Sequence, residues 1–382
     1  MKKKKTYRFK HQIYSTNKTK YKRFHKYHKY NLSLMFKFTV NVIFLFIVYL
    51  MYSNLIKKIN IQTEQKLDVV NIKNGFNYSL KYEEFDENIN KQYIQMQNYF
   101  CDKQNESLIP EFEKRIKKAN ADYSGKKFEM FVHTGIDYVS QSIFNSHNWE
   151  GPLAQNILGA LEYYAKKKNL ENKDVYLLDI GCNVGFFTYY LGKYGYKILS
   201  FEAWELNNYI IYKNYCLNRD VNVTIINKGL DTEDKKCIMK TSSINQGNGL
   251  IICKDRDKTL SDLNGEKIDN IELTKLSRYV KFLSEKNLGA IKMDVEGSEG
   301  NVIEGGKELI SKYHIPFLLI EYETRMLEAH ATKVLEFLEF FTNNGYKISL
   351  KNFFSKDYIS PNEIVNNTNI LNLYMIYEKF LE

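Results

Sequence analysis

Apolar and polar blocks alternate along the chain from residue 175 to its end. Short apolar runs bounded by glycine or charged residues predict strands, and longer segments with apolar positions three or four apart predict helices. Strands are predicted over residues 175–180, 196–201, 223–227, 290–295, 315–322, 346–350 and 371–377, with 237–240 and 250–253 as a hairpin. Helices are predicted over residues 152–168, 206–217, 273–286, 299–312 and 334–341. This alternation predicts an α/β domain whose seven-stranded, mostly parallel sheet carries helices on both faces.

The stretch from Val175 to Glu202 is the clearest unit in this pattern. It holds an apolar strand carrying Asp179, a turn with glycines at 181 and 185, an amphipathic helix, and a second strand followed by Glu202. Glycine lets the backbone approach a ligand closely, and an acid after the second strand is placed to accept hydrogen bonds from ribose hydroxyls. The unit therefore predicts a nucleotide-sized crevice at the carboxyl edge of the sheet.

Residues 38–56 form the longest uncharged apolar segment. As a helix they would span about 28 Å, close to the hydrocarbon thickness of a bilayer. Seven Lys/Arg lie in residues 18–37 and four in 57–76, so the positive-inside rule places the N-terminus in the cytosol. We expect a single-pass signal anchor, with the catalytic domain in the lumen of the Golgi or endoplasmic reticulum. A buried core helix is the alternative interpretation.

This topology divides the chain into four parts. Residues 1–37 would be a basic, disordered cytoplasmic tail, 38–56 the anchor, 57–121 a stem and 122–382 the catalytic domain. The tail holds thirteen Lys/Arg and no Asp/Glu, and removing it from the net charge of +10 leaves the rest of the chain at −3. A nearly neutral folded part argues against nucleic acid as a partner. The five cysteines show no C-x-x-C spacing, so the sequence leaves their pairing open.

The turn D-I-G-C-N-V-G after the first strand departs from the dinucleotide fingerprint G-x-G-x-x-G. Its two glycines are spaced G-x-x-x-G, and an acid at position 179 precedes them. A pyrophosphate would be repelled by an acid in that loop, whereas the sulfonium and ammonium of S-adenosylmethionine suit nearby acids. We therefore expect S-adenosylmethionine as the cofactor. A plain strand-to-helix connection is the alternative.

The segment I-K-M-D-V-E-G-S-E, residues 291–299, is the second chemically distinctive one. Period-two alternation places Lys292, Asp294 and Glu296 on one side of the strand. Charges in a central strand are costly unless they are paired or lie at its carboxyl end, so the three predict a reaction centre. A lysine–carboxylate pair that only satisfies itself is the alternative. On the same rim, Asn227 could contact adenine and Glu321 could face the acceptor.

Five motifs together carry a resemblance to a known family. They are D-I-G-C-N-V-G-F-F, S-F-E-A-W, N-K-G-L, K-M-D-V-E-G-S-E-G-N-V-I-E-G-G and L-L-I-E-Y. Over residues 131–378 the chain resembles the FkbM family of S-adenosylmethionine-dependent methyltransferases. The resemblance implies the class I methyltransferase fold, which is Rossmann-like, and O-methylation of acceptors that include sugars and polyketides, without a metal. The chain departs from the family at 203–204, where Ala-Trp replaces the usual proline after F-E.

The resemblance also implies roles for particular residues. Asp294 and Glu296 would face the reaction centre, and Asp179, Gly181, Asn183, Gly185 and Glu202 would bind the cofactor. From the residues themselves we add Lys292 to the catalytic group, with either acid as the base that takes a proton from the hydroxyl. We likewise add Asn227 and Trp204 to the cofactor site, with Trp204 stacked on adenine.

We therefore expect a membrane-anchored O-methyltransferase that acts on a glycan or another small acceptor in the secretory pathway. Two alternatives stay open at this point. One is a nicotinamide-dependent oxidoreductase, which the missing middle glycine disfavours. The other is a non-catalytic, membrane-tethered binding module on a methyltransferase fold. The sequence does not indicate the oligomeric state.

Overall fold

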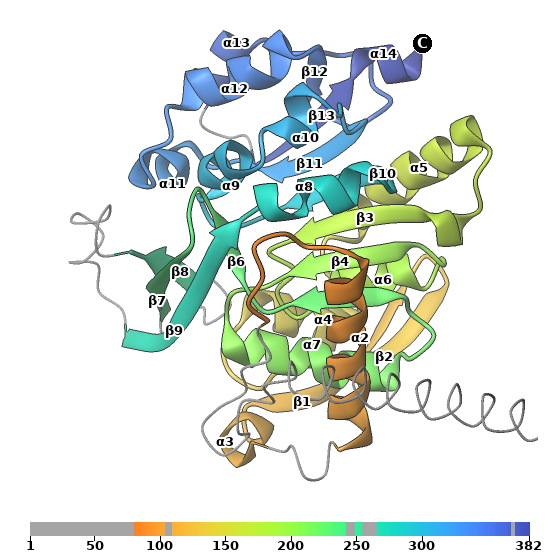
Figure 1. Ribbon diagram of the computed structural model, residues 1–382, viewed down its shortest axis with the longest axis vertical. Helices are drawn as coiled ribbons and strands as arrows, with labels where there is room; N and C mark the ends of the chain where they lie inside the picture. The colour runs from red at the N-terminus through yellow and green to blue at the C-terminus, as the bar shows by residue number, and fades with distance from the viewer. Residues whose placement is uncertain (1–79, 104–108, 242–248, 254–265, 368–370) are drawn as a thin grey trace, which may run out of the picture. The chain divides into compact units, whose positions relative to one another are not determined.

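A computed structural model of the chain describes residues 80–103, 109–241, 249–253, 266–367 and 371–382 (Figure 1). The predicted tail, the apolar span at 38–56 and part of the predicted stem lie outside these residues. Within the described ranges, no helix combines the length and the apolar character that a membrane crossing requires. The anchor therefore stays a prediction.

Seven strands form the main sheet. They are β3 (Val175–Ile180), β4 (Lys197–Phe201), β5 (Val223–Ile226), β10 (Asn287–Met293), β11 (Phe317–Glu321), β12 (Tyr346–Ser349) and β13 (Asn372–Tyr377). Their order is β12-β13-β11-β10-β3-β4-β5. The strands from β11 to β5 are mutually parallel, and β13 is antiparallel to both of its neighbours. The predicted methyltransferase-like α/β fold is confirmed, with a mixed sheet.

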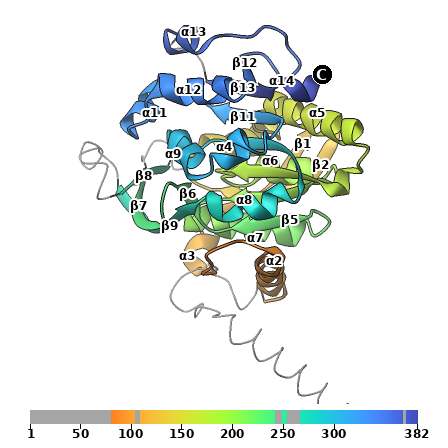
Figure 2. The same ribbon diagram turned by 45° about the horizontal axis from the view of Figure 1, so that its top comes forward.

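Helices cover both faces of this sheet (Figures 1 and 2). They are α2 (Glu87–Asp102), α3 (Pro110–Glu113), α4 (Tyr138–Ser146), α5 (Gly151–Lys168), α6 (Phe186–Gly192), α7 (Glu205–Leu217), α8 (Ser277–Ser284), α9 (Glu299–Gly305), α10 (Glu308–Ser311), α11 (Thr324–Ala329), α12 (Val334–Asn343), α13 (Pro361–Val365) and α14 (Glu378–Leu381), with a 3-10 turn at Asn172–Asp174. Leu178 and Ile291 belong to the apolar cluster shared with α8, α10 and α12. On the other face, α5 packs against Gly289 and α6 bonds to Asp179. Burial on both faces explains why these strands read as nearly continuous apolar runs.

Two smaller sheets accompany the main one. Strands β1 (Ile116–Tyr123) and β2 (Lys126–His133) form an antiparallel hairpin that the sequence did not predict. Strands β6 (Gly229–Asp231), β7 (Lys235–Thr241), β8 (Gly249–Ile252) and β9 (Glu266–Lys275) form a sheet in the order β6-β9-β7-β8. The predicted hairpin of β7 and β8 is confirmed, and a Cys237–Cys253 disulfide closes it.

Three predicted elements end elsewhere than expected. The helix predicted from residue 273 starts at Ser277, because β9 continues to Lys275 with Ile271 and Leu273 buried. The helix predicted over 299–312 is divided into α9 and α10 at Gly306. Strand β10 ends at Met293 and not at residue 295, because the chain turns at Glu296, where φ is 53°.

Helix α2 lies within the predicted stem, yet it packs on the main sheet. Its Gln97 side chain donates to the carbonyl of Val223 and accepts from the N–H of Ile225, both at 2.9 Å, along the edge strand β5. Cys101 of α2 forms a disulfide with Cys216 of α7. The polar residues that α2 buries weaken its amphipathic pattern, which hid its packing from the sequence. The folded domain therefore extends N-terminally beyond the predicted boundary at residue 122.

We predict that replacing Cys101 and Cys216 by alanine lowers the free energy of unfolding by about 3–5 kcal/mol, because their disulfide closes a long loop in the unfolded chain. The two cysteines are 115 residues apart, whereas Cys237 and Cys253 are 16 apart. Denaturant unfolding of the oxidised protein should therefore show a smaller loss for the Cys237→Ala, Cys253→Ala pair. Equal losses for the two pairs would contradict this assignment.

Candidate functional site

The loops that follow β3 and β10 meet at the carboxyl edge of the sheet. The N–H of Asp294 donates to the carbonyl of Ile180 at 3.1 Å. Gly181 adopts a φ of +71°, and a Cβ at this position would lie 1.8 Å from the carbonyl oxygen of Asp294. Only glycine fits both the conformation and the space. The two motifs that the sequence singled out are therefore in direct backbone contact.

Lys292 of β10 links the two loops through hydrogen bonds. Its side chain is buried, and its ammonium donates to the carbonyl of Gly181 at 3.0 Å and to Oδ2 of Asp294 at 3.2 Å. Burial alone would lower the pKa of Lys292, but the charges of Asp294, Asp179 and Glu150 raise it overall. The lysine is thus a permanent cation with a positioning role, not a group that exchanges protons at neutral pH.

Asp179 belongs to a buried polar row beside Lys292. It is the register partner of Lys292 on one side and of Ser200 on the other. Its Oδ2 accepts from the Thr188 hydroxyl at 2.6 Å, and that hydroxyl lies 2.8 Å from Ser200 Oγ. Burial raises the pKa of Asp179, and its side chain is not among those that line the cavity described below. Asp179 is therefore buried beneath the cavity wall and does not border the space in which the cofactor was predicted to contact it.

Glu202 organises the opposite side of the glycine turn. Its two carboxylate oxygens accept the N–H groups of Asn183 at 2.9 Å and Trp204 at 2.8 Å. Burial raises the pKa of Glu202 to about 7, although these hydrogen bonds lower it. The backbone of Ala203 and the side chain of Asn207 are also hydrogen-bonded to this carboxylate, which offers about four acceptor positions in all. A ribose hydroxyl would therefore share or displace one of these donors. Glu202 and Asn183 both line the cavity, as predicted for cofactor-binding residues.

The remaining predicted cofactor residues lie in three different settings. Trp204 lines the cavity, but its ring is only 1% exposed and stacks on His133 with centroids 5.1 Å apart. One ring face is therefore already covered, and stacking of Trp204 on adenine stays a prediction. Gly185 caps α6 at a φ of +88° away from the cavity lining. The amide oxygen of Asn227 is buried with no hydrogen-bond partner in the described part of the chain, beside the lining residue Lys228.

A cavity of about 310 Å³ lies above these loops. Its lining includes Gly181, Cys182, Asn183, Glu202, Trp204 and, from the small sheet, Met239 and Ile251. It also includes Tyr138, Trp149, Glu150, Lys292, Asp294, Glu296 and Glu321. Small-molecule sites begin at roughly this volume. The close backbone approach at Gly181 and the Glu202 carboxylate in the cavity wall fit an adenosyl group, and the acids fit a cationic sulfur.

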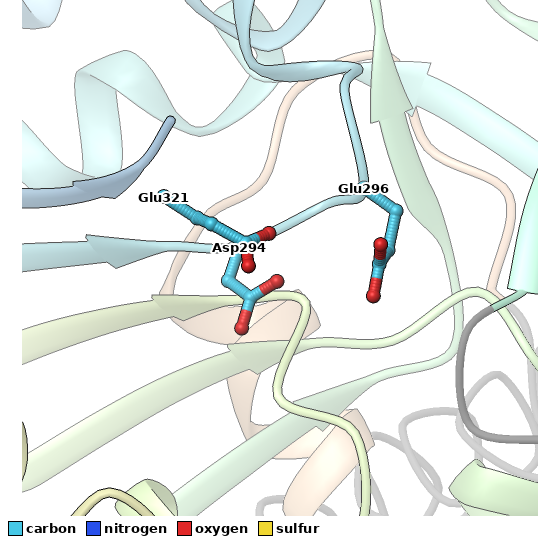
Figure 3. A group of neighbouring side chains, drawn as sticks. All are labelled: Asp294, Glu296 and Glu321. Atoms are coloured by element: carbon cyan, nitrogen blue, oxygen red, sulfur yellow. The ribbon is translucent and has the colours of Figure 1, made fainter. Parts of the chain in front are cut away.

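Three carboxylates of the cavity lining lie close together (Figure 3). Asp294, Glu296 and Glu321 each place an oxygen within 4.8 Å of the others. Burial raises the pKa of Glu296 to about 8, with the Asp294 charge adding to it. Burial and Asp294 raise the pKa of Glu321 to about 11, so Glu321 is protonated at neutral pH and can donate to Asp294. Such oxygens could hold a divalent cation, which the sequence did not predict, but the cation would have to displace these protons.

Glu150 is one of several lining residues that the sequence did not assign to the site. It precedes α5 with a φ of 45°, and its pKa is raised by burial and by Asp294 and lowered by Lys292. The W-E-G-P segment marked a helix start. Nothing in that local pattern reveals that the turn carries Glu150 to the acids after β10, more than 140 residues later.

Comparison with known proteins agrees with this geometry. Residues 179–348 match the family model described as the methyltransferase FkbM domain. The chain therefore contains a methyltransferase FkbM domain over residues 179–348, and S-adenosylmethionine is its cofactor. No curated protein sequence is matched.

Several solved structures show a distant likeness. One is monomeric WbdD, at 10% identity and a TM-score of 0.35, covering 64% of this chain and 46% of that one. Another is magnesium protoporphyrin IX methyltransferase from Synechocystis PCC 6803 with bound SAM, at 12% identity and a TM-score of 0.32, covering 78% of this chain and 99% of that one. This chain spans less than half of the length of the WbdD structure. Scores of this size carry no argument about function.

We predict that Lys292→Met lowers the free energy of unfolding by about 3–5 kcal/mol at pH 8, because it leaves buried carboxyls without their cation. The loss should be smaller at pH 5. A buried carboxyl with a raised pKa, such as Asp179, binds a proton in the folded state that the unfolded chain releases, so stability falls as the pH rises through that pKa. Denaturant unfolding at both pH values measures this. The exposed Lys307→Met is the control; equal losses at pH 5 and pH 8 would contradict the buried pairing.

Proposed function

We propose that the protein transfers a methyl group from S-adenosylmethionine to a hydroxyl of a glycan or similar acceptor. The observation that supports this most is the position of Asp294, which lines the same cavity as the glycine turn and is held by Lys292. The cofactor would supply an electrophilic methyl: the acceptor oxygen bonds to the methyl carbon, the carbon–sulfur electron pair stays on sulfur, and the hydroxyl proton passes to a carboxylate.

The acids have distinct parts in this proposal. Asp294 orients the acceptor hydroxyl and takes its proton, because Lys292 and the protonated Glu321 fix its carboxylate. Glu296 is the alternative base, and with a pKa of about 8 it would act best in mildly alkaline solution. Glu202 and the turn from Gly181 to Asn183 hold the adenosyl part. Alignment of the hydroxyl with the methyl group then provides much of the acceleration.

The alternative enzyme class is less well supported. A nicotinamide-dependent oxidoreductase would need the turn after β3 to take a pyrophosphate. Gly181 approaches the backbone of Asp294, and Asn183 bonds to Glu202, so acidic groups surround that turn. The family match also favours methyl transfer. The arrangement of Asp294, Glu296 and Glu321 in the cavity is likewise unnecessary for a binding module without catalysis.

We also propose that the domain lies in the secretory lumen behind the anchor at 38–56. Its two disulfides, Cys101–Cys216 and Cys237–Cys253, support this because such bonds persist in oxidising compartments. The sequons at Asn222 and Asn366 start at exposed residues, which glycosylation requires. The sequons at Asn77 and Asn105 lie outside the described residues.

We predict that Asp294→Asn in the full-length protein lowers turnover by about 10²–10⁴-fold, because proton acceptance is lost. Affinity for S-adenosylmethionine, measured by isothermal titration, should change by less than about threefold, as Asp294 acts on the acceptor. Asp357→Asn, at an exposed position, should leave both unchanged. Normal turnover in Asp294→Asn but not in Glu296→Gln would transfer the role of base to Glu296. No binding of S-adenosylmethionine by the unmodified protein would remove the proposed function.

For the location, we predict that the protein expressed in a eukaryotic secretory system gains mass sensitive to an N-glycosidase. Replacing Asn222 and Asn366 by Gln should remove the part of that mass that these two sites carry. In intact microsomes the domain should be protected from added protease. Cleavage of the domain without detergent would place it on the cytosolic side.

A further inference from the structure

Part of the cavity lining precedes the region that matches the family. Tyr138 and Val139 of α4, together with Trp149 and Glu150 before α5, line the cavity, whereas the family match begins at residue 179. The donor-side residues Gly181, Asn183 and Glu202 all fall within the match. The lining residues that precede the family match are therefore the candidates for selecting the acceptor.

Two of these side chains are large aromatic rings. Tyr138 is 54% exposed and Trp149 is partly buried, and both border the same cavity. An aromatic ring presents a flat, weakly negative face that packs on the C–H groups of a saturated ring, and its polar tip can bond to a hydroxyl. An exposed tyrosine at a cavity mouth suits a ligand that extends out of the cavity, as an oligosaccharide would.

Glu150 brings a carboxyl to the same end. Its backbone conformation is left-handed, with a φ of 45°, which residues other than glycine adopt only at an energetic cost. The next residue, Gly151, is held against the Tyr123 ring, where a Cβ would lie 2.3 Å from the ring. Glu150 also borders a small recess shared with Lys292, Asp294 and Glu321. The turn thus directs an acid toward the reacting end of the cavity.

The charge of this end excludes one group of acceptors. Glu150, Asp294, Glu296 and Glu321 line it together with a single cation, Lys292. That ammonium is already bonded to Gly181 and Asp294. Among the described lining residues, the other cation is Lys228, which follows β5 and pairs with Glu272 at 3.6 Å. A carboxylate, sulfate or phosphate on the acceptor would therefore find, among the described lining residues, only cations that already have partners.

We propose that residues 138–150 form the acceptor subsite and that this subsite takes an uncharged sugar ring. The faces of Tyr138 and Trp149 pack on the ring, and the Glu150 carboxyl accepts hydrogen bonds from its hydroxyls beside Asp294. This inference depends on the proposed methyl transfer and narrows its acceptor to neutral sugars. Tyr138 and Trp149 act on acceptor affinity, and Glu150 orients the hydroxyl that reacts.

The test uses the full-length protein with radiolabelled S-adenosylmethionine and a panel of defined oligosaccharides. The panel pairs hexose and N-acetylhexosamine chains with counterparts bearing a uronate, a phosphate or a free amine. We expect label on the uncharged chains at least tenfold above every anionic counterpart. Trp149→Ala and Tyr138→Ala should raise the KM for the acceptor about tenfold with little change in kcat. Glu150→Gln should lower kcat/KM by at least tenfold.

Matched controls separate these effects from misfolding. Tyr99→Ala and Glu162→Gln alter exposed residues away from the cavity lining and should stay within twofold of the unmodified protein. Isothermal titration should give the same affinity for S-adenosylmethionine in all five variants, which shows that the donor side is intact.

The outcomes distinguish this inference from the proposed function. Preferred labelling of an anionic or amine-bearing chain, or no labelling of any sugar with cofactor binding intact, would overturn the sugar subsite and leave the donor site standing. Variants of Tyr138, Trp149 and Glu150 that behave like the controls would also overturn it. Failure of the unmodified protein to bind S-adenosylmethionine would instead remove the proposed function.

Discussion

The buried ammonium of Lys292 is the contact on which the site depends. It lies at the centre of a polar row that crosses the sheet from Ser200 through Asp179, and it bonds to the backbone of one loop and the carboxylate of the other. A lone buried charge would cost several kcal/mol, so the row is stable only as a complete set. The same set fixes the distance between the two loops that define the cavity.

This arrangement separates the tasks of the acids. Asp179 is enclosed by the protein, so its charge serves the scaffold, whereas Asp294 shares the same lysine but faces the cavity. Glu202 is intermediate, since its oxygens hold the glycine turn in place while its carboxylate still borders the cavity. Acidic residues that look equivalent in the sequence motifs therefore differ in how deeply they are buried. The role of each one depends on whether its carboxylate oxygens bond only to protein groups or also border the cavity.

The sequence predicted the parts of the fold that depend on local periodicity. Strand β3 was placed with its observed bounds, and all seven strands of the main sheet were found, because buried parallel strands leave continuous apolar runs. It missed contacts made by polar residues that are buried only in the tertiary structure. Gln97 of α2 forms hydrogen bonds with the backbone of β5, and hydrophobic periodicity does not predict that such a polar side chain is buried. The β1–β2 hairpin was missed as well, since its exposed face carries lysines within a polar segment.

The candidate site shows the same division between local and distant information. The donor side follows from one βαβ unit and a motif on the adjacent strand, so its residues could be predicted before the structure was known. The acceptor side combines Glu150 with Glu321, which lie on separate elements more than 170 residues apart along the chain. Glu150 and Glu321 come close together because α5 and β11 both pack beside β10. This proximity is a property of the tertiary structure, and no local sequence pattern predicts it. A common cofactor requires the first kind of information to be shared within a family, whereas a particular acceptor requires the second. We therefore infer that the acceptor is selected by Tyr138, Trp149 and Glu150, which line the cavity and precede the family match.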